Sequence, residues 1–168
     1  MIQKKLCMVG SFGVGKTSLV KRYVQSIFSE KYHTTVGVKI DKKDVIVGPE
    51  TIRMMIWDLA GDDAFARLRT TFVRGSAGYL LVADGTRTQT LDVALELNRQ
   101  IQDATGKLPF VLVVNKFDLA SAWEIDTNRI TALEEAGVKV FRTSAKDGFG
   151  VESVFEHFAV LETLERAS

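Results

Sequence analysis

A glycine-rich segment near the N-terminus has the residue types and spacing that bind a chain of phosphate groups. It reads Gly10-Ser11-Phe12-Gly13-Val14-Gly15-Lys16-Thr17 and separates a short apolar run from a stretch with helical spacing. Its glycines let the backbone curl so that several N–H groups point at phosphate oxygens, at the N-terminus of the following helix. Lys16 can reach the β- and γ-phosphates, and the Thr17 hydroxyl can bind Mg²⁺. The sequence therefore predicts a nucleotide phosphate site formed by Gly10, Gly13, Val14, Gly15, Lys16, Thr17 and Ser18.

Two further segments have groups that suit the magnesium ion and the terminal phosphate. Asp58 ends an apolar run and is followed by Leu59-Ala60-Gly61. A carboxylate at a strand end near the phosphate loop is an expected partner of Mg²⁺, and the N–H of Gly61 can approach a phosphate because glycine has no Cβ. Thr35, in a loop, could complete the metal shell. We predict Thr17, Thr35 and Asp58 as metal ligands; a simple turn at 58–61 and an ordinary loop threonine are the alternatives.

A third segment selects the base. Asn115-Lys116-Phe117-Asp118 follows an apolar run, and the Asp118 carboxylate can accept hydrogen bonds from both N1–H and N2–H₂ of guanine, a donor pair that adenine lacks. Asn115 can bond the base and tie the phosphate loop to this segment, and the alkyl stem of Lys116 can lie along the base. Ser144-Ala145-Lys146 can add a backbone N–H for the guanine carbonyl oxygen. The prediction is guanine, although Asn115–Asp118 alone could be a solvated turn.

The elements that position these residues alternate along the chain. Apolar runs of strand length occupy 6–9, 51–59, 78–83, 110–114 and 138–141, and helical spacing lies between them and in the last segment, at Val151, Val154, Phe155, Phe158, Leu161 and Leu164. Continuous apolar strands are buried on both faces, which is typical of a parallel sheet covered by helices. The alternating segments 38–41 and 44–47, with a turn at 48–49, predict an edge strand antiparallel to 51–57. We expect a three-layer α/β fold with a six-stranded, mostly parallel sheet and about five helices.

Composition narrows the class of protein. The 168 residues suit one domain, and a net charge of +1 from 22 basic and 21 acidic residues argues against a dedicated nucleic-acid binder. The single cysteine, Cys7, excludes an internal disulfide and fits a reducing compartment. The chain lacks an apolar run of membrane-spanning length, a glycine at position 2 and a C-terminal cysteine for a lipid. We expect a cytoplasmic monomer without a membrane anchor of its own.

These residues together resemble the Ras superfamily of small GTPases, and the Rab-like branch most closely. The resemblance runs from Lys4 to about Leu164, with the motifs at 10–17, 35, 58–61, 115–118 and 144–146 in family order. It implies a GTP/GDP switch with Mg²⁺, in which two loops order around the γ-phosphate and relax after hydrolysis. It also implies that Phe28 covers the guanine ring; from the residues alone, a core phenylalanine ending the first helix is an equal alternative.

The Rab-like character rests on Thr35-Val36-Gly37, on Trp57 before Asp58 and on the segment 72–77. In that branch an aromatic cluster near the switch loops binds effector proteins, and exchange factors and activating proteins act on the same surface. The matching positions here are Ile40, Trp57 and Phe72. Ile40 replaces the usual phenylalanine, which would make the surface less aromatic. The alternative is that all three residues are simply packed.

The chain departs from the family at two positions that matter for hydrolysis. The resemblance implies catalytic positions at Lys16, Thr35, Gly61 and the next residue, where this chain has Asp62 instead of the catalytic glutamine. An ionised aspartate accepts hydrogen bonds but cannot donate one to the transferring phosphoryl group. Phe12 stands where the family has a small residue, and its ring could block an arginine from an activating protein or cover the site. Arg67, Arg69 and Arg74 are candidates for a catalytic charge within the chain.

Three functions are compatible with these features. The leading interpretation is a GTP-hydrolysing switch with slow intrinsic turnover. A second is a GTP-locked module that binds effectors without turnover, which Asp62 and Phe12 favour. A third is a P-loop kinase or ATPase, against which the segment 115–118 speaks.

Overall fold

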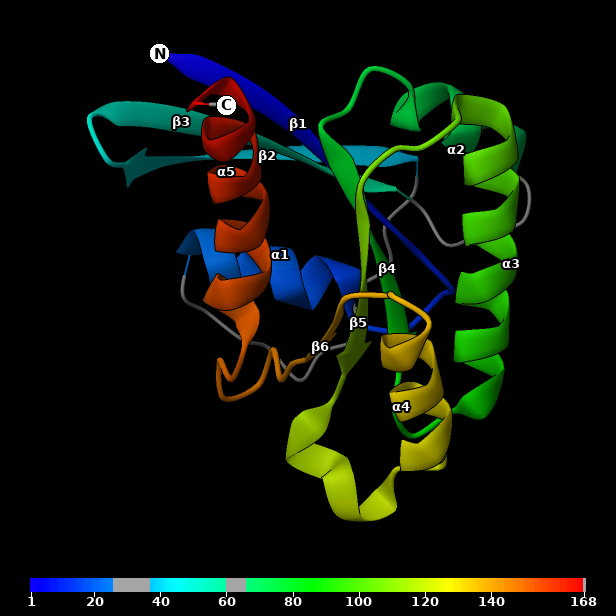
Figure 1. Cartoon of the computed structure of the whole chain (residues 1–168). Helices are drawn as coiled ribbons and strands as arrows, with labels where there is room; N and C mark the ends of the chain where they lie inside the picture. The colour runs from blue at the N-terminus through cyan, green and yellow to red at the C-terminus, as the bar shows by residue number, and fades with distance from the viewer. Residues whose placement is uncertain (26–36, 60–65, 168) are drawn as a thin grey trace.

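The computed structural model describes residues 1–25, 37–59 and 66–167, with only the backbone described for 66–69 and 162–167 (Figure 1). Its centre is a six-stranded sheet in the order β2-β3-β1-β4-β5-β6. β2 pairs with β3 antiparallel and the other neighbours pair in parallel, as the sequence predicts. The strands are β1 (Ile2–Gly10), β2 (Val38–Val47), β3 (Glu50–Leu59), β4 (Gly78–Asp84), β5 (Phe110–Asn115) and β6 (Val140–Arg142).

Five α-helices within the described residues cover both faces of the sheet, which gives the predicted three-layer α/β fold. Figure 1 shows α1 and α5 on one face and α2, α3 and α4 on the other. Their bounds are α1 (Lys16–Gln25), α2 (Ala66–Val73), α3 (Thr88–Thr105), α4 (Thr127–Glu135) and α5 (Val151–Ala167), and a 3₁₀ helix, η2, spans Phe117–Ala122.

None of the helices in the described part of the chain is both long and apolar enough to cross a membrane.

The core lies in two layers because alternate residues of a strand point to opposite faces. In β1, Leu6 and Met8 pack in the cluster that includes α1 and α5, whereas Cys7 and Val9 pack in the cluster with α2, α3 and α4. All four side chains are fully buried. Burial on both faces explains why the strand is a continuous apolar run instead of an alternating one.

The strand register places the ends of the parallel strands at one edge of the sheet. Gly10, the last residue of β1, pairs with Val82 of β4, and Asp84 at the end of β4 pairs with Asn115 at the end of β5. The loops that follow these strands therefore meet at the same edge. This is where ligands bind in parallel α/β sheets.

Burial predicts an unreactive thiol. Desolvation raises the pKa of Cys7 to about 11, although Lys5 and a hydrogen bond with Ser76 act in the opposite direction. At pH 8 only about one thiol in a thousand would then be ionised, so the folded protein should not react with a thiol reagent while the unfolded chain reacts fully. Spectrophotometric labelling in buffer and in guanidinium chloride measures this. A Ser153→Cys variant, with its new thiol on the exposed side of α5, is the positive control; rapid labelling of the unmodified protein would contradict the prediction.

Candidate nucleotide-binding site

The phosphate loop closes around the ammonium group of Lys16. This residue begins α1 and is 6% exposed, and its Nζ donates to the carbonyl oxygens of Gly10 at 2.9 Å and Ser11 at 3.0 Å. Leu19 N–H donates to the Gly15 carbonyl, so the helix starts directly after the loop. The loop thus presents a positive charge and a helix N-terminus on one side, which is suited to an anionic ligand.

A side chain from the segment 115–118, the predicted base selector, contacts the phosphate loop. Asn115 ends β5 and is 2% exposed; its Nδ2 donates to the carbonyl of Val14 at 3.0 Å. A Cβ placed on Gly15, which has φ +102°, would lie 2.2 Å from the same Nδ2. Only glycine allows this approach. The predicted tie between Asn115 and the phosphate loop is therefore present in the structure.

Two oxygen groups meet where the metal is expected. Thr17 Oγ1 donates to Asp58 Oδ2 at 2.5 Å, and the Asp58 side chain is 1% exposed at the end of β3. A hydroxyl and a carboxylate are hard oxygen ligands of the kind that Mg²⁺ takes, together with substrate phosphates and water. Thr17 and Asp58 fit the ion and are the described residues that would hold it.

The base end is built from two connected loops. Asn115 Oδ1 accepts from Thr143 Oγ1 at 3.0 Å, and Phe117 N–H donates to the Thr143 carbonyl at 2.9 Å. Ser144 Oγ donates to Asp118 Oδ1 at 2.9 Å, so that the exposed Asp118 carboxylate is held at one oxygen by the loop after β6. This geometry orients a bidentate acceptor of the kind that a guanine edge requires.

The loop after β6 is also fixed to α1. Arg22 Nε donates to the carbonyl of Ala145 at 2.7 Å, and Arg22 Nη2 donates to the carbonyl of Lys146. Ser144 and Ala145 are buried, whereas Lys146 is exposed. The segment 144–146 therefore joins α1 to the segment 115–118, which carries the predicted base-binding residues and is called the base loop below.

Lys116 has a strained backbone and a fixed charge. It is the one non-glycine residue with positive φ, at +72°, within the described residues. Its Nζ pairs with Asp84 Oδ2 at 2.8 Å. Burial alone would raise the pKa of Asp84, but hydrogen bonds from Lys116, Thr86 and Arg87 outweigh it and hold that pKa below its usual value. Strain of this kind persists where surrounding contacts impose it, often at binding sites.

Comparison with known proteins identifies the family. The sequence model described as "Ras family" matches residues 5–163. The chain belongs to the Ras family. Human Ras-related protein Rab-25 is 35% identical over 154 residues, covering 90% of this chain and 72% of Rab-25. Human Rab-7b is 36% identical over 163 residues, covering 94% and 81%, and Rab-3 of Caenorhabditis elegans is 32% identical over 154 residues, covering 90% and 70%.

These relatives place the chain in the Rab-like branch of the small GTPases, as the motifs predict. The match supports a GTP-binding switch GTPase and argues against the kinase or ATPase alternative. Ras family members bind GTP and GDP, typically with Mg²⁺, and act with regulators and effectors.

Several of the residues that the family resemblance selects lie outside the described residues: Phe28, Thr35, Gly61 and Asp62. The same applies to the side chains of Arg67 and Arg69. Their roles stay predictions.

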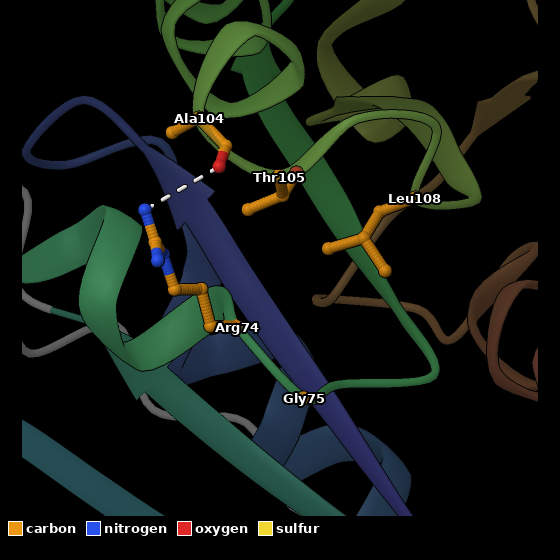
Figure 2. A pocket seen from close by; sticks show the side chains of 5 residues that line it. All are labelled: Arg74, Gly75, Ala104, Thr105 and Leu108. Carbon is orange, nitrogen blue, oxygen red and sulfur yellow. Dashed lines mark hydrogen bonds between the residues drawn. The ribbon is translucent and has the colours of Figure 1, made fainter.

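Arg74, the third candidate for a catalytic charge, is placed elsewhere. Figure 2 shows it beside a pocket of about 220 Å³ with Gly75, Ala104, Thr105 and Leu108, and its Nη2 lies 3.4 Å from the carbonyl of Ala104. Ala104 is near the end of α3, roughly 24 Å along the helix from its start at a rise of about 1.5 Å per residue. The hypothesis that Arg74 acts in catalysis within the chain is wrong, because Arg74 lies at the opposite end of the sheet from the phosphate loop.

The structure adds three residues that the sequence analysis missed. Arg87 Nη2 donates to the Phe12 carbonyl in the phosphate loop, and Asp84 pairs with both Arg87 and Lys116. Trp123 Nε1 donates to the Lys116 carbonyl at 2.8 Å. Asp84 could have been found, because an acid at the end of an apolar strand is the same signal that selected Asp58.

The three residues expected to bind effectors do come together. Ile40 is opposite Trp57 in the antiparallel register, and the rings of Trp57 and Phe72 are 5.8 Å apart. Ile40 is 48% exposed, while Trp57 and Phe72 are partly buried against the core. Lys5 Nζ also lies 4.0 Å from the Trp57 ring centroid. The cluster is thus partly packed and partly accessible.

The contact of Trp123 predicts a measurable change in nucleotide release. Its ring lies against Gly85, where a Cβ would be 2.1 Å from the indole, and its N–H supports the Lys116 carbonyl. Trp123→Phe keeps a ring but loses this hydrogen bond, which contributes about 0.5–1.5 kcal/mol. We expect GDP to dissociate about two- to tenfold faster in a fluorescent-nucleotide displacement assay.

Tyr79→Phe is the matched control for this change. It also removes the polar group of an aromatic ring, here a hydroxyl that donates to Asn98 Oδ1 and accepts from Gln102 Nε2, both at 2.5 Å and both in the second half of α3. Equal release rates in the two variants would contradict a specific role for Trp123.

Proposed function

We propose that this chain is a guanine-nucleotide switch that binds GTP and GDP with Mg²⁺ and hydrolyses GTP slowly, with residues 1–168 acting as one G domain. The observation that carries this proposal is the contact between the phosphate loop and the base loop. Asn115 bonds Val14 and Thr143 at 3.0 Å each, so the two halves of a nucleotide site have a fixed separation. A phosphate loop alone is compatible with any nucleotide. A phosphate loop joined to the loop that carries Asp118 supports a purine nucleotide whose guanine edge faces Asp118.

The proposed binding roles follow from the chemistry of each group. Lys16 and the loop N–H groups of Gly13, Val14 and Gly15 bind the phosphates, and Thr17 with Asp58 holds the metal. Asn115, Lys116, Asp118 and the loop 144–146 bind guanine. Phe28, Thr35 and Gly61 keep the roles that the family resemblance implies, covering the base, completing the metal shell and contacting the γ-phosphate.

Slow hydrolysis is proposed from Asp62. A glutamine amide can both accept from the attacking water and donate to the transferring phosphoryl group, but a carboxylate can only accept. The carboxylate also brings a negative charge towards an anionic centre. Losing one transition-state hydrogen bond costs about 2.7–4 kcal/mol, or roughly 10²–10³ in rate.

The second candidate function is a GTP-locked module, and the exposure of Phe12 favours it. This side chain is 50% exposed at the phosphate loop. A large ring at this position would obstruct an arginine that an activating protein supplies. Such a module would recruit effectors through the cluster of Ile40, Trp57 and Phe72 for as long as GTP stays bound.

Nucleotide content and single-turnover kinetics test both functions. The purified protein should contain guanine nucleotide by chromatography after denaturation, mostly GDP for a slow switch and mostly GTP for a locked module. For the switch, Asp62→Gln should raise the single-turnover rate of GTP hydrolysis by about 10²-fold, because the amide restores the donated hydrogen bond.

Asp63→Gln is the matched control, since it removes the neighbouring carboxylate and leaves position 62 unchanged. If Asp62→Gln and Asp63→Gln hydrolyse GTP at the same rate, the explanation through Asp62 is wrong. Tighter binding of ATP than of GTP would overturn the guanine assignment itself.

A further inference from the structure

Arg87 connects the phosphate loop to the end of β4. Its Nε pairs with Asp84 Oδ2 at 3.0 Å, and its Nη2 donates to the carbonyl oxygen of Phe12 at 3.1 Å. A guanidinium is planar with fixed N–H directions, so two contacts on different partners determine its position. We propose that Arg87 is a positioning residue that orients the peptide group between Phe12 and Gly13 for phosphate binding, an inference that rests on the function proposed above.

The orientation of this peptide group decides what the loop offers to a ligand. A trans peptide is planar, and its carbonyl and N–H point in opposite directions. Holding the Phe12 carbonyl towards Arg87 therefore directs the Gly13 N–H away from the guanidinium. If the peptide turned over, a carbonyl oxygen would face an anionic phosphate where a donor is needed.

The backbone at this point does not fix the orientation by itself. Gly13 has φ +75°, and glycine adopts positive and negative φ almost equally well. The two orientations of a peptide group before a glycine therefore have similar intrinsic energies, as they do in type I and type II turns. A contact outside the loop has to select one of them. Arg87 makes such a contact, with an acceptor that belongs to this peptide group.

Arg87 is itself held firmly by its surroundings. The Asp84 side chain is 1% exposed and also binds Lys116 at 2.8 Å and Thr86, whose N–H and Oγ1 donate at 2.9 and 2.7 Å. Charge-assisted hydrogen bonds of this kind are stronger than neutral ones. The same carboxylate thus anchors the cation of the base loop and the cation that reaches the phosphate loop.

The position of Arg87 in the helix supports a role outside the helix. It is the N-cap of α3, with φ −134° and ψ 101°, and its side chain does not cap the helix. Serine, threonine, aspartate and asparagine are favoured there, and a cation is unfavourable near a helix N-terminus. Helix formation therefore does not account for an arginine at this position, whereas the contact with the Phe12 carbonyl does.

The test compares Arg87→Gln and Arg87→Lys with Arg99→Gln, using GDP and GMP as probes. Arg99 is on the same helix and pairs with Glu96 and Asp103 on the exposed surface, so its variant controls for the loss of an α3 charge. Arg87→Gln should weaken GDP binding about tenfold, with faster dissociation, and GMP binding less than twofold. GMP lacks the phosphates beyond the first, so the contrast isolates the end of the phosphate chain.

Arg87→Lys keeps a positive charge for Asp84 but cannot reach both partners with fixed N–H directions. It should therefore resemble Arg87→Gln in GDP dissociation while keeping the melting temperature of the unmodified protein. Amide hydrogen exchange in the segment 10–15 should be faster in both variants and unchanged in Arg99→Gln.

The outcomes separate the positioning role from the proposed function. Equal losses for GDP and GMP, or GDP dissociation from Arg87→Gln at the rate of Arg99→Gln, would overturn the positioning role alone. Failure of the unmodified protein to bind any guanine nucleotide would overturn the proposed function and this inference together.

Discussion

The buried side-chain amide of Asn115 is the interaction on which the rest of the site depends. An amide without water must find partners within the protein, and leaving one buried acceptor or donor unpaired costs about 1–3 kcal/mol. Asn115 satisfies both ends, donating to Val14 after β1 and accepting from Thr143 after β6. Three loops at the edge of the sheet are therefore held in one arrangement. The requirement for glycine at position 15 follows, because any Cβ there would displace the amide.

The sequence predicted a six-stranded, mostly parallel sheet with one antiparallel edge pair, but it gave neither the order of the strands in the sheet nor all of their bounds. β1 was expected at 6–9 and begins at Ile2, because its polar start is stabilised by contacts that are distant in sequence. Lys4 is 2% exposed and its Nζ donates to the carbonyls of Phe158 and Ala159 on α5, both at 2.9 Å. Periodicity detects buried apolar residues, so it finds the apolar half of such a strand and not the half that carries a buried lysine.

The same limit applies to the site. Asn115, Asp118 and the segment 144–146 were predictable because their residue types occur at a fixed spacing after apolar strands. Arg87 was not, because its partner Phe12 is 75 residues away and contributes only a backbone carbonyl, which has no sequence signature. Trp123 presents the same difficulty, since its hydrogen bond also ends on a carbonyl, that of Lys116. A hydrogen bond to a backbone carbonyl can be identified only once the fold shows which donor lies next to that carbonyl.

Arg87 and Phe12 together also bear on how the chain responds to partners. An activating protein that inserts an arginine must bring a cation to the phosphate loop, and here a guanidinium of the chain already occupies the Phe12 carbonyl. The Arg87 side chain is 47% exposed and shares Asp84 with Lys116, so this group of three has a net charge of +1 that would repel an incoming cation within a Debye length of about 8–10 Å. The half-exposed ring of Phe12 adds bulk at the same place. Under the proposed function, charge and shape would therefore both oppose insertion of a partner's arginine, which is what the GTP-locked alternative requires.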